Sequence, residues 1–335
     1  MLLVTYHQDD DKHNLAAYED NGTSITQGML LGVDLTEAEL RGFCFAPTLS
    51  FGELWVLNGA SHQSEILGFK RLGLSLRYTL TARIALYPEI DSLWHPFDLT
   101  FSSQGNKLYC YVSNQDTNVV ARLVVGTNVT AAPIAPALLQ NGLFLKGTFV
   151  ASSDGKLPNV PKTTEVLLAD GGLDVEVKKE KIVSSIRGVI WNSETLYVAD
   201  EPGEAIKCYD ASGGFLGQTQ PIEAPVHLHL HEETVKGARV QMLYATGQRG
   251  VFWTPLPLRK QAPSIFEFPT QPGIKMEDPS GIAFAPDGTL YVADRKNSQI
   301  ILYKDFTPNS PPPKPSATFQ VGGEPEFILW TAEAP

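Results

Sequence analysis

The chain has neither a long hydrophobic segment nor a surplus of basic charge. It contains no run of about 18 apolar residues, so no transmembrane helix is predicted. Lys and Arg number 26 against 37 Asp and Glu, which gives a formal net charge of −11. Surfaces that bind nucleic acids or anionic membranes are usually basic, so this balance predicts neither kind of partner.

Cysteine is scarce as well. The three cysteines, Cys44, Cys110 and Cys208, are far apart and lie in or beside apolar strand-like runs. This pattern favours buried reduced thiols over a disulfide framework. The N-terminus, MLLVTYHQDDDKH, has only a short apolar run followed by acids, which does not predict a signal peptide. We therefore expect a soluble, cytoplasmic protein, or a secreted one had a signal peptide been removed.

The common nucleotide and nucleophile motifs are also missing. The sequence has no P-loop, no dinucleotide fingerprint, no G-x-S-x-G elbow and no Cys-x-x-Cys pair. What it does contain is 28 Gly and 24 Pro, spread along the whole length. Such a distribution is typical of many short strands joined by turns.

The clearest unit of this kind is Asp278 to Phe306, DPSGIAFAPDGTLYVADRKNSQIILYKDF. Residues 281–285, 290–293 and 299–303 read as three short strands. Pro286 to Gly288 forms a tight turn between the first two, because Pro presets φ and Gly accepts positive φ. A lone meander cannot bury both of its faces, so the unit predicts neighbours of the same kind.

The same order of strands and turns recurs along the chain. The expected units are 40–72, 95–126, 143–178, 186–218, 225–256 and 278–306. Residues 324–335 and 1–25 supply the strands of one more unit, shared between the two termini. The prediction is therefore a single all-β domain over 1–335, a seven-bladed β-propeller closed by its N- and C-terminal strands, with six blades as the alternative.

Two stretches carry a family resemblance. The segments "PSGIAFAPDGTLYVAD" and "IRGVIW…TLYVAD" resemble NHL repeats, and the whole pattern is similar to the NHL, YVTN and regucalcin/gluconolactonase-like propellers. The resemblance implies a fold and no single function, because propellers host many activities. We interpret the Asp or Asn that ends each second strand as a turn or ladder cap. These residues are Asn58, Asn114, Asp170, Asp200 and Asp294.

Function is expected where the repeats disagree, at the channel end where the first strands enter. The first strands of the units can be aligned on the large apolar residue near the end of each strand. Two positions in this alignment, each called a column here, differ from strand to strand. The first column reads Arg41, Phe97, Lys146, Arg187, Val226, Ser280 and Glu326. The second reads Gly42, Asp98, Gly147, Gly188, His227, Gly281 and Phe327. Glycine dominates the second column, which predicts crowded backbones there.

The cations of the first column predict an anion site. Partly withdrawn from water, Arg41, Lys146 and Arg187 would attract a carboxylate, enolate or phosphate group. The expected substrate-binding residues are Arg41, Lys146, Arg187, His95, Ser280 and Phe97. His227, Asp98 and Glu326 would supply acid–base catalysis. The alternative is that these charges pair with one another and neutralise the channel.

A metal site is the second possibility. His227, His229 and His231 alternate along one strand, a spacing that allows two imidazoles to share a metal ion. The resemblance to gluconolactonase-like enzymes implies one divalent ion, such as Ca²⁺, Mg²⁺ or Zn²⁺, at the channel. The resemblance maps its ligands onto Glu324 or Glu326, Asn114 and Asp278, and His229 of the alternating strand is a further candidate ligand. The neighbouring cations would repel such an ion, so no obligatory cofactor is expected.

The sequence thus predicts a small-molecule enzyme working at the channel mouth on an anionic or enolisable organic substrate. The expected chemistry is proton transfer of the lyase, isomerase or cyclase type. Two alternatives stay open. One is a metal-dependent lactonase of the gluconolactonase-like type, and the other is a non-enzymatic NHL-type interaction scaffold.

Overall fold

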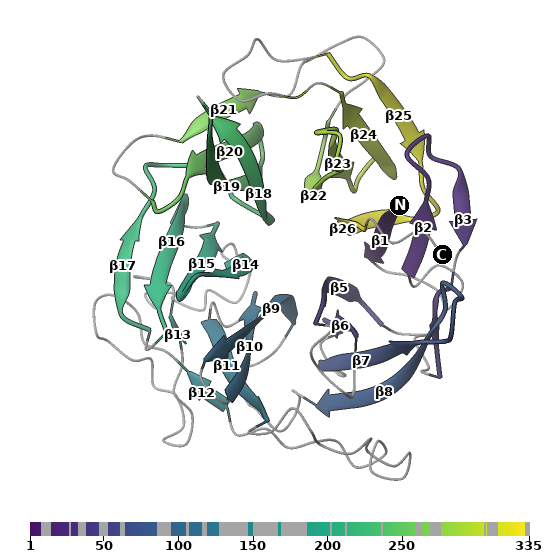
Figure 1. The fold of residues 1–335 in the computed structure, drawn as a ribbon, viewed down its shortest axis with the longest axis horizontal. Helices are drawn as coiled ribbons and strands as arrows, with labels where there is room; N and C mark the ends of the chain where they lie inside the picture. The colour runs from purple at the N-terminus through teal and green to yellow at the C-terminus, as the bar shows by residue number, and fades with distance from the viewer. Residues whose placement is uncertain are drawn as a thin grey trace, which may run out of the picture.

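Six β-sheets are arranged as blades around a central axis (Figure 1). The computed structural model describes residues 1–7, 15–26, 28–32, 38–46, 53–60, 64–85, 95–104, 107–115, 119–126, 147–149, 167–168, 186–201, 203–211, 213–235, 237–258, 263–267, 276–304, 306 and 314–331. Within these ranges no helix is long and apolar enough to cross a membrane.

Each blade is built from a run of antiparallel strands, and the first strand of that run is innermost. Blade 1 contains β5 (Leu40–Phe45), β6 (Leu54–Asn58), β7 (Glu65–Arg71) and β8 (Tyr78–Ala85), with β4 (Leu30–Leu31) parallel to β8 at the rim. Blade 2 contains β9 (Pro96–Gln104), β10 (Lys107–Asn114), β11 (Val119–Gly126), β12 (Gly147–Phe149) and β13 (Leu167–Leu168). Blade 3 contains β14 (Ile186–Asn192), β15 (Thr195–Asp200), β16 (Ala205–Asp210) and β17 (Phe215–Gln218).

The second half of the ring follows the same plan. Blade 4 contains β18 (Leu228–Val235), β19 (Ala238–Gly247), β20 (Gly250–Pro255) and β21 (Ser264–Glu267). Blade 5 contains β22 (Pro279–Phe284), β23 (Leu290–Asp294), β24 (Gln299–Tyr303) and β25 (Ala317–Gln320). Blade 6 joins β26 (Glu324–Trp330) to β1 (Leu2–His7), β2 (Leu15–Tyr18) and β3 (Ser24–Thr26).

The prediction of seven blades is wrong, and the six-bladed alternative describes the ring. The expected blade at 143–178 does not form, because both of its described strands pair with β11 of blade 2. β12 covers the part of β11 from Ala121 to Leu123, and β13 covers Val119 and Val120. With three and two residues, these strands are too short to form an inner strand and its partner, so they extend an existing sheet.

Both termini lie in blade 6, where β1 pairs with β26 from Leu2↔Trp330 to His7↔Glu324. Joining the first and last strands in one sheet removes the open edge that an unclosed ring would expose. Figure 1 shows β1 and β26 side by side next to the axis. The ring closure expected from the sequence is therefore present.

With six blades, glycine alternates with a larger residue around the axis. In ring order the positions are Gly42, Asp98, Gly188, His227, Gly281 and Phe327. Each glycine lies against the next inner strand. A Cβ on Gly188 would meet the carbonyl oxygen of Val226 at 2.8 Å, and one on Gly281 would meet the amide nitrogen of Ile328 at 2.7 Å. The predicted crowding is real, and it fixes the spacing of the inner strands.

The hydrophobic core consists of clusters packed between neighbouring blades. Between blades 1 and 2, for example, Trp55 and Leu57 pack against Leu99 and Val112. All three cysteines are free; Cys110 and Cys208 are buried. Burial raises the pKa of the Cys208 thiol to about 11, which keeps it protonated and unreactive at neutral pH.

Candidate functional site

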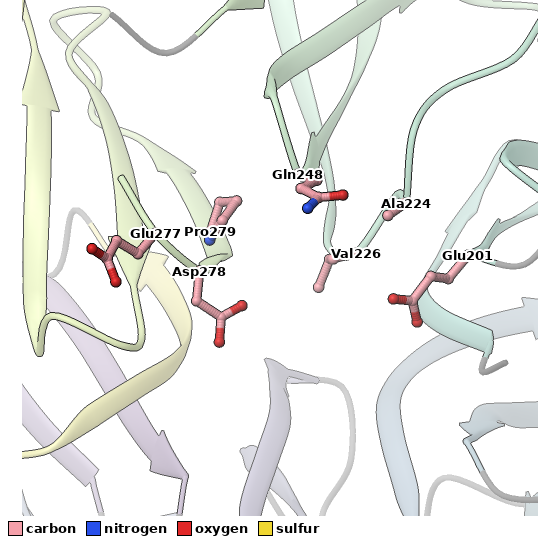
Figure 2. A pocket seen from close by; sticks show the side chains of 7 residues that line it. All are labelled: Glu201, Ala224, Val226, Gln248, Glu277, Asp278 and Pro279. Atoms are coloured by element: carbon pink, nitrogen blue, oxygen red, sulfur yellow. The ribbon is translucent and has the colours of Figure 1, made fainter. Parts of the chain in front are cut away.

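A cavity of about 250 Å³ opens where the inner strands begin, at the mouth of the channel. Blades 3, 4 and 5 each contribute to its wall. Its lining residues are Glu201, Ala224, Val226, Gln248, Glu277, Asp278 and Pro279. In Figure 2 the carboxylates of Glu201 and Asp278 lie on opposite sides, with Val226 between them, whereas the Glu277 carboxylate points away.

Each carboxylate of the cavity is held by a neighbouring cation. Nε of Arg187 lies 2.7 Å from Oε2 of Glu201. Nη2 of Arg295 lies 2.7 Å from Oδ2 of Asp278, and its Nε lies 2.8 Å from the same oxygen. These pairs fix the orientation of both carboxylates without filling the cavity between them.

The repeated Asp and Asn residues shape this mouth. Both oxygens of Asp294 accept backbone hydrogen bonds, Oδ1 from Asp278 at 3.0 Å and Oδ2 from Glu277 at 3.3 Å. Asn58 accepts in the same way from the backbone N–H of Glu39, at 3.1 Å. A residue of the scaffold thus sets the backbone of the loop that carries the acids of the site.

A buried charge network lies beside the cavity and joins blades 6, 1 and 5. Glu326 is 2% exposed, with Oε1 3.1 Å from Nη1 of Arg41 and Oε2 3.1 Å from Nη1 of Arg295. Burial works to raise the pKa of Glu326, but the charges of Arg41 and Arg295 outweigh it and hold this pKa below its ordinary value. His7 lies at the edge of the network, where burial lowers its pKa to about 4.

Arg41 also meets a second carboxylate at the rim. Its Nη2 lies 2.9 Å from Oε2 of Glu39 and 2.7 Å from Nε2 of His95. Nε2 of His95 in turn lies 2.9 Å from Oε2 of Glu39. The hydrogen bond from His95, together with the charge of Arg41, lowers the pKa of Glu39 to about 2 against the opposing effect of burial.

The contacts of Glu39 with Arg41 and His95 are expected to make the stability of the fold depend on pH. A carboxyl whose folded pKa is lowered stabilises the fold above its unfolded pKa of about 4.5 and loses that contribution as the pH falls to about 2. Replacing His95 by Ala removes the principal cause, so the Glu39 pKa is expected to rise toward 4.5 and the acid-induced loss of stability to shrink. Carbon-detected NMR titration of the Glu39 carboxyl measures this. An unchanged midpoint in the variant would contradict the assignment.

Phe97 lies beneath the charged layer and is 1% exposed. The guanidinium of Arg187 lies 5.0 Å from its ring centroid and that of Arg41 lies 5.8 Å away. The ring of Phe327 packs 5.0 Å from the ring of Phe97. Aromatic rings therefore occupy the axis below the mouth, and the guanidinium groups of two arginines lie over the ring of Phe97.

Asp98 lies in the contact between blades 2 and 3 and does not line the described cavity. Its Oδ1 accepts from the backbone N–H of Leu99 at 2.8 Å, and Oδ2 accepts from that of Val189 at 2.9 Å. Burial raises the pKa of Asp98 to about 7, although both hydrogen bonds act to lower it. In this position Asp98 links two blades.

His227 has an equivalent position in the contact between blades 4 and 5. Its Nδ1 accepts from the backbone N–H of Ile282 at 3.1 Å, and its ring meets Phe327 edge-on at 5.0 Å. Burial lowers the pKa of His227 to about 3, so the imidazole is neutral at physiological pH. With Nδ1 already engaged, its remaining capacity is donation from Nε2.

The other predicted residues are dispersed. Ser280 donates to the carbonyl oxygen of Pro325 at 2.7 Å, and His229 lies against Phe284, 5.6 Å between ring centroids. Glu324 is exposed, and Asn114 is buried where β10 ends. Lys146 lies outside the described residues. In the part of the chain that the structure describes, no three His, Cys, Asp or Glu side chains gather as metal ligands do.

Three residues of the site were missed by the sequence columns: Glu39, Glu201 and Arg295. Two of them directly follow a repeated Asp, Glu201 after Asp200 and Arg295 after Asp294. That position differs from blade to blade, which is the signal that could have identified them. Glu39 precedes the first aligned residue of β5 and fell outside both columns.

Comparisons with known proteins support this fold. The model of the NHL repeat matches residues 277–301. No curated protein matches the sequence. Among solved structures, periplasmic gluconolactonase PpgL of Pseudomonas aeruginosa is 15% identical with a TM-score of 0.56, covering 97% of this chain and 84% of that chain.

Two further structures are similar over nearly the whole chain. A chain of the nidogen/laminin complex is 13% identical with a TM-score of 0.55, covering 98% of this chain and 97% of that one. A streptogramin B lyase is 13% identical with a TM-score of 0.52, covering 98% and 87%. Identities this low establish a shared fold and leave activity open. The chain therefore contains one stretch that matches the NHL repeat, and it shares a β-propeller fold with these structures along nearly its whole length.

Proposed function

We propose that the protein is a small-molecule enzyme whose substrate binds in the mouth cavity. The observation that carries the proposal is the pair of carboxylates, Glu201 and Asp278, on opposite sides of a cavity built by three consecutive blades. Each carboxylate is oriented by an arginine, and an ionised carboxylate held in a fixed position can act as a general base.

The proposed reaction is proton transfer, of the lyase or lactone-hydrolase type. One carboxylate takes a proton from water or from a carbon next to a carbonyl group. The guanidinium of Arg187, which is paired with the cavity residue Glu201, stabilises the negative charge that develops on the carbonyl oxygen. In hydrolysis the water oxygen bonds to the carbonyl carbon and the ring C–O bond breaks, whereas in elimination a C=C bond forms as the C–O bond β to the carbonyl breaks. In both cases the proton then passes to the oxygen that leaves. His227 and Asp98 contribute through the blade contacts that hold this mouth in shape.

The substrate is proposed to be a neutral, hydroxyl- or carbonyl-bearing ring. An anion was expected from the cations of the inner strands, but Arg41 is buried between Glu326 and Glu39, and Arg187 is paired with Glu201. The cavity therefore presents paired charges that both donate and accept hydrogen bonds. A sugar lactone has the matching groups, and its size suits a cavity of about 250 Å³. Cellular location, cytoplasmic or secreted, stays a prediction.

The test is a screen of the wild-type protein for hydrolysis or elimination of sugar lactones and related cyclic esters, followed by two variants. Asp278→Asn and Glu201→Gln are each expected to lower kcat/KM about 100-fold or more, because a positioned general acid or base contributes at least that much. Glu277→Gln is the matched control, since its carboxylate points out of the same cavity.

Equal turnover by the wild type and Asp278→Asn would contradict the proposed roles. The absence of turnover and binding across the whole screen would favour the remaining alternative, an NHL-type scaffold that binds other proteins.

A further inference from the structure

The β7–β8 hairpin of blade 1 differs in charge from the rest of the molecule. Residues 66–85 contain Lys70, Arg71, Arg77 and Arg83 and no Asp or Glu, in a chain with 37 acids and a net charge of −11. The whole-chain balance predicts no contact with an anionic membrane. This hairpin is locally cationic, so it attracts an anionic surface although the whole chain is negatively charged.

The tip of the hairpin also exposes apolar side chains. Leu74 is 87% exposed and Leu72 is 43% exposed. Among the large hydrophobic side chains of the described residues, none is more exposed than Leu74. Phe45, at the end of β5, is 36% exposed, and its ring centroid lies 6.5 Å from that of Tyr78, the first residue of β8.

The tip is held in this shape by its own hydrogen bonds. The backbone N–H of Leu72 donates to the carbonyl oxygen of Arg77 at 2.9 Å. Oγ of Ser75 donates to the carbonyl oxygen of Leu72 at 2.7 Å, and Nε of Arg71 donates to that of Ser75 at 2.8 Å. A loop with these bonds presents Leu74 to solvent as part of its fixed structure.

Three of the four cations lie at the tip. Lys70 and Arg71 end β7, and Arg77 immediately precedes β8. Arg83 is paired with Glu65 at the opposite end of the hairpin, 3.1 Å from Nε to Oε2. In the described part of the chain, Lys70 and Arg77 form no such ion pair.

The tip is on the face of the ring opposite the cavity. β5 runs from Arg41, at the mouth, to Phe45, and Phe45 pairs with Leu54 of β6. Leu54 in turn pairs with Phe69, next to the tip. Figure 1 shows β7 and β8 toward the rim of their blade, away from the axis.

We propose that this hairpin tip, residues 70–77, attaches the protein peripherally to an anionic lipid bilayer. Leu72 and Leu74 insert at the level of the headgroups, and Lys70, Arg71 and Arg77 contact lipid phosphates. The tip is convex and presents two leucines, too small a surface for a stable protein interface, whereas a bilayer accepts a convex insertion. The cavity then faces away from the lipid and stays accessible.

The attachment is weak and reversible. Two leucines and three cations provide less apolar area and less charge than the acyl chain with a polybasic patch that stable anchoring takes. Neighbouring turns on the same face carry acids, Glu19 and Asp20 in blade 6 and Asp287 in blade 5, all of them exposed. Repulsion from anionic lipid therefore confines contact to the one hairpin, and added salt weakens the attachment.

The test is co-sedimentation of the full chain with phosphatidylcholine vesicles prepared with and without phosphatidylserine. The wild type is expected to bind the phosphatidylserine vesicles preferentially, and binding is expected to fall with added salt. Leu74→Glu, and separately Lys70→Glu with Arg77→Glu, should lower the partition coefficient about 10-fold or more. Circular dichroism checks that the variants fold.

Leu216→Glu in β17 is the matched control, because this leucine is also exposed, at 57%, and its strand, Phe215–Gln218, contains no Lys or Arg. It should leave binding unchanged. No association of the wild type with phosphatidylserine vesicles overturns the proposal, and so does equal binding by wild type and Leu74→Glu.

Discussion

Replacing Glu326 by Gln is expected to lower the free energy of unfolding by about 3–5 kcal/mol. The carboxylate is 2% exposed and neutralises two arginines, Arg41 from blade 1 and Arg295 from blade 5. Arg41 is itself only 2% exposed, so the amide leaves a buried positive charge without its principal partner. Because Glu326 lies on β26 of the closing blade, the ring loses stability where its two ends meet.

Chemical denaturation monitored by tryptophan fluorescence measures this difference. Glu324→Gln is the matched control, because Glu324 is two residues earlier on the same strand and exposed. The carboxyl pKa of Glu326 is lowered, so its contribution is present above an unfolded pKa of about 4.5 and is lost as the pH falls below it. The difference in the free energy of unfolding between wild type and Glu326→Gln should therefore become smaller at acidic pH. Equal stability of the two variants at neutral pH would contradict the proposed role of the network.

Replacing Gly281 by Ala is expected to destabilise the protein by about 3 kcal/mol. The new Cβ would lie 2.7 Å from the backbone nitrogen of Ile328 and 3.1 Å from the carbonyl carbon of Phe327. Those atoms belong to the neighbouring inner strand, so relief of the contact requires β22 and β26 to separate. Elsewhere in a strand, Gly→Ala commonly stabilises a protein slightly, so the sign of the effect is informative.

Gly73→Ala is the comparison that separates crowding from backbone strain. Gly73 has φ of +58° and nothing within 4 Å of an added Cβ, so only the strain of a left-handed residue remains, about 1 kcal/mol. Thermal unfolding of both variants by calorimetry gives the two values. A smaller loss in Gly281→Ala than in Gly73→Ala would contradict the close packing of inner strands.

The fold could be predicted from the sequence except for the number of blades. Strand and turn signals located every inner strand that forms, and the termini were paired correctly. The error came from residues 143–178, where apolar runs resemble inner strands but pair with β11. Leaving Gly147 out of the second column restores the alternation of glycine with a larger residue, as in Gly42 followed by Asp98. Crowding between adjacent strands allows only one large residue per pair, so this pattern could have indicated six blades.

The candidate site was harder to predict. An alignment of strands shows which residues lie at the same height along the channel, but not which side chains they contact. Arg41 and Glu326 were identified, and the structure brings them into contact. Asp98 and His227 were chosen for their chemistry, but in the ring each accepts a hydrogen bond from the next blade. Arg295 lies in a turn of the most regular repeat and outside both aligned columns, although it binds Asp278 at the cavity.

The proposed function requires that small molecules bind in the mouth cavity and not along the axis below it, which aromatic rings occupy. An amide NMR titration of the isotope-labelled protein with a sugar lactone, or with the acid that its hydrolysis yields, tests this directly. Chemical-shift changes are predicted to cluster at Val226, Gln248 and Asp278, which line the cavity. Changes confined to other parts of the ring, or none at saturating ligand, would contradict the claim.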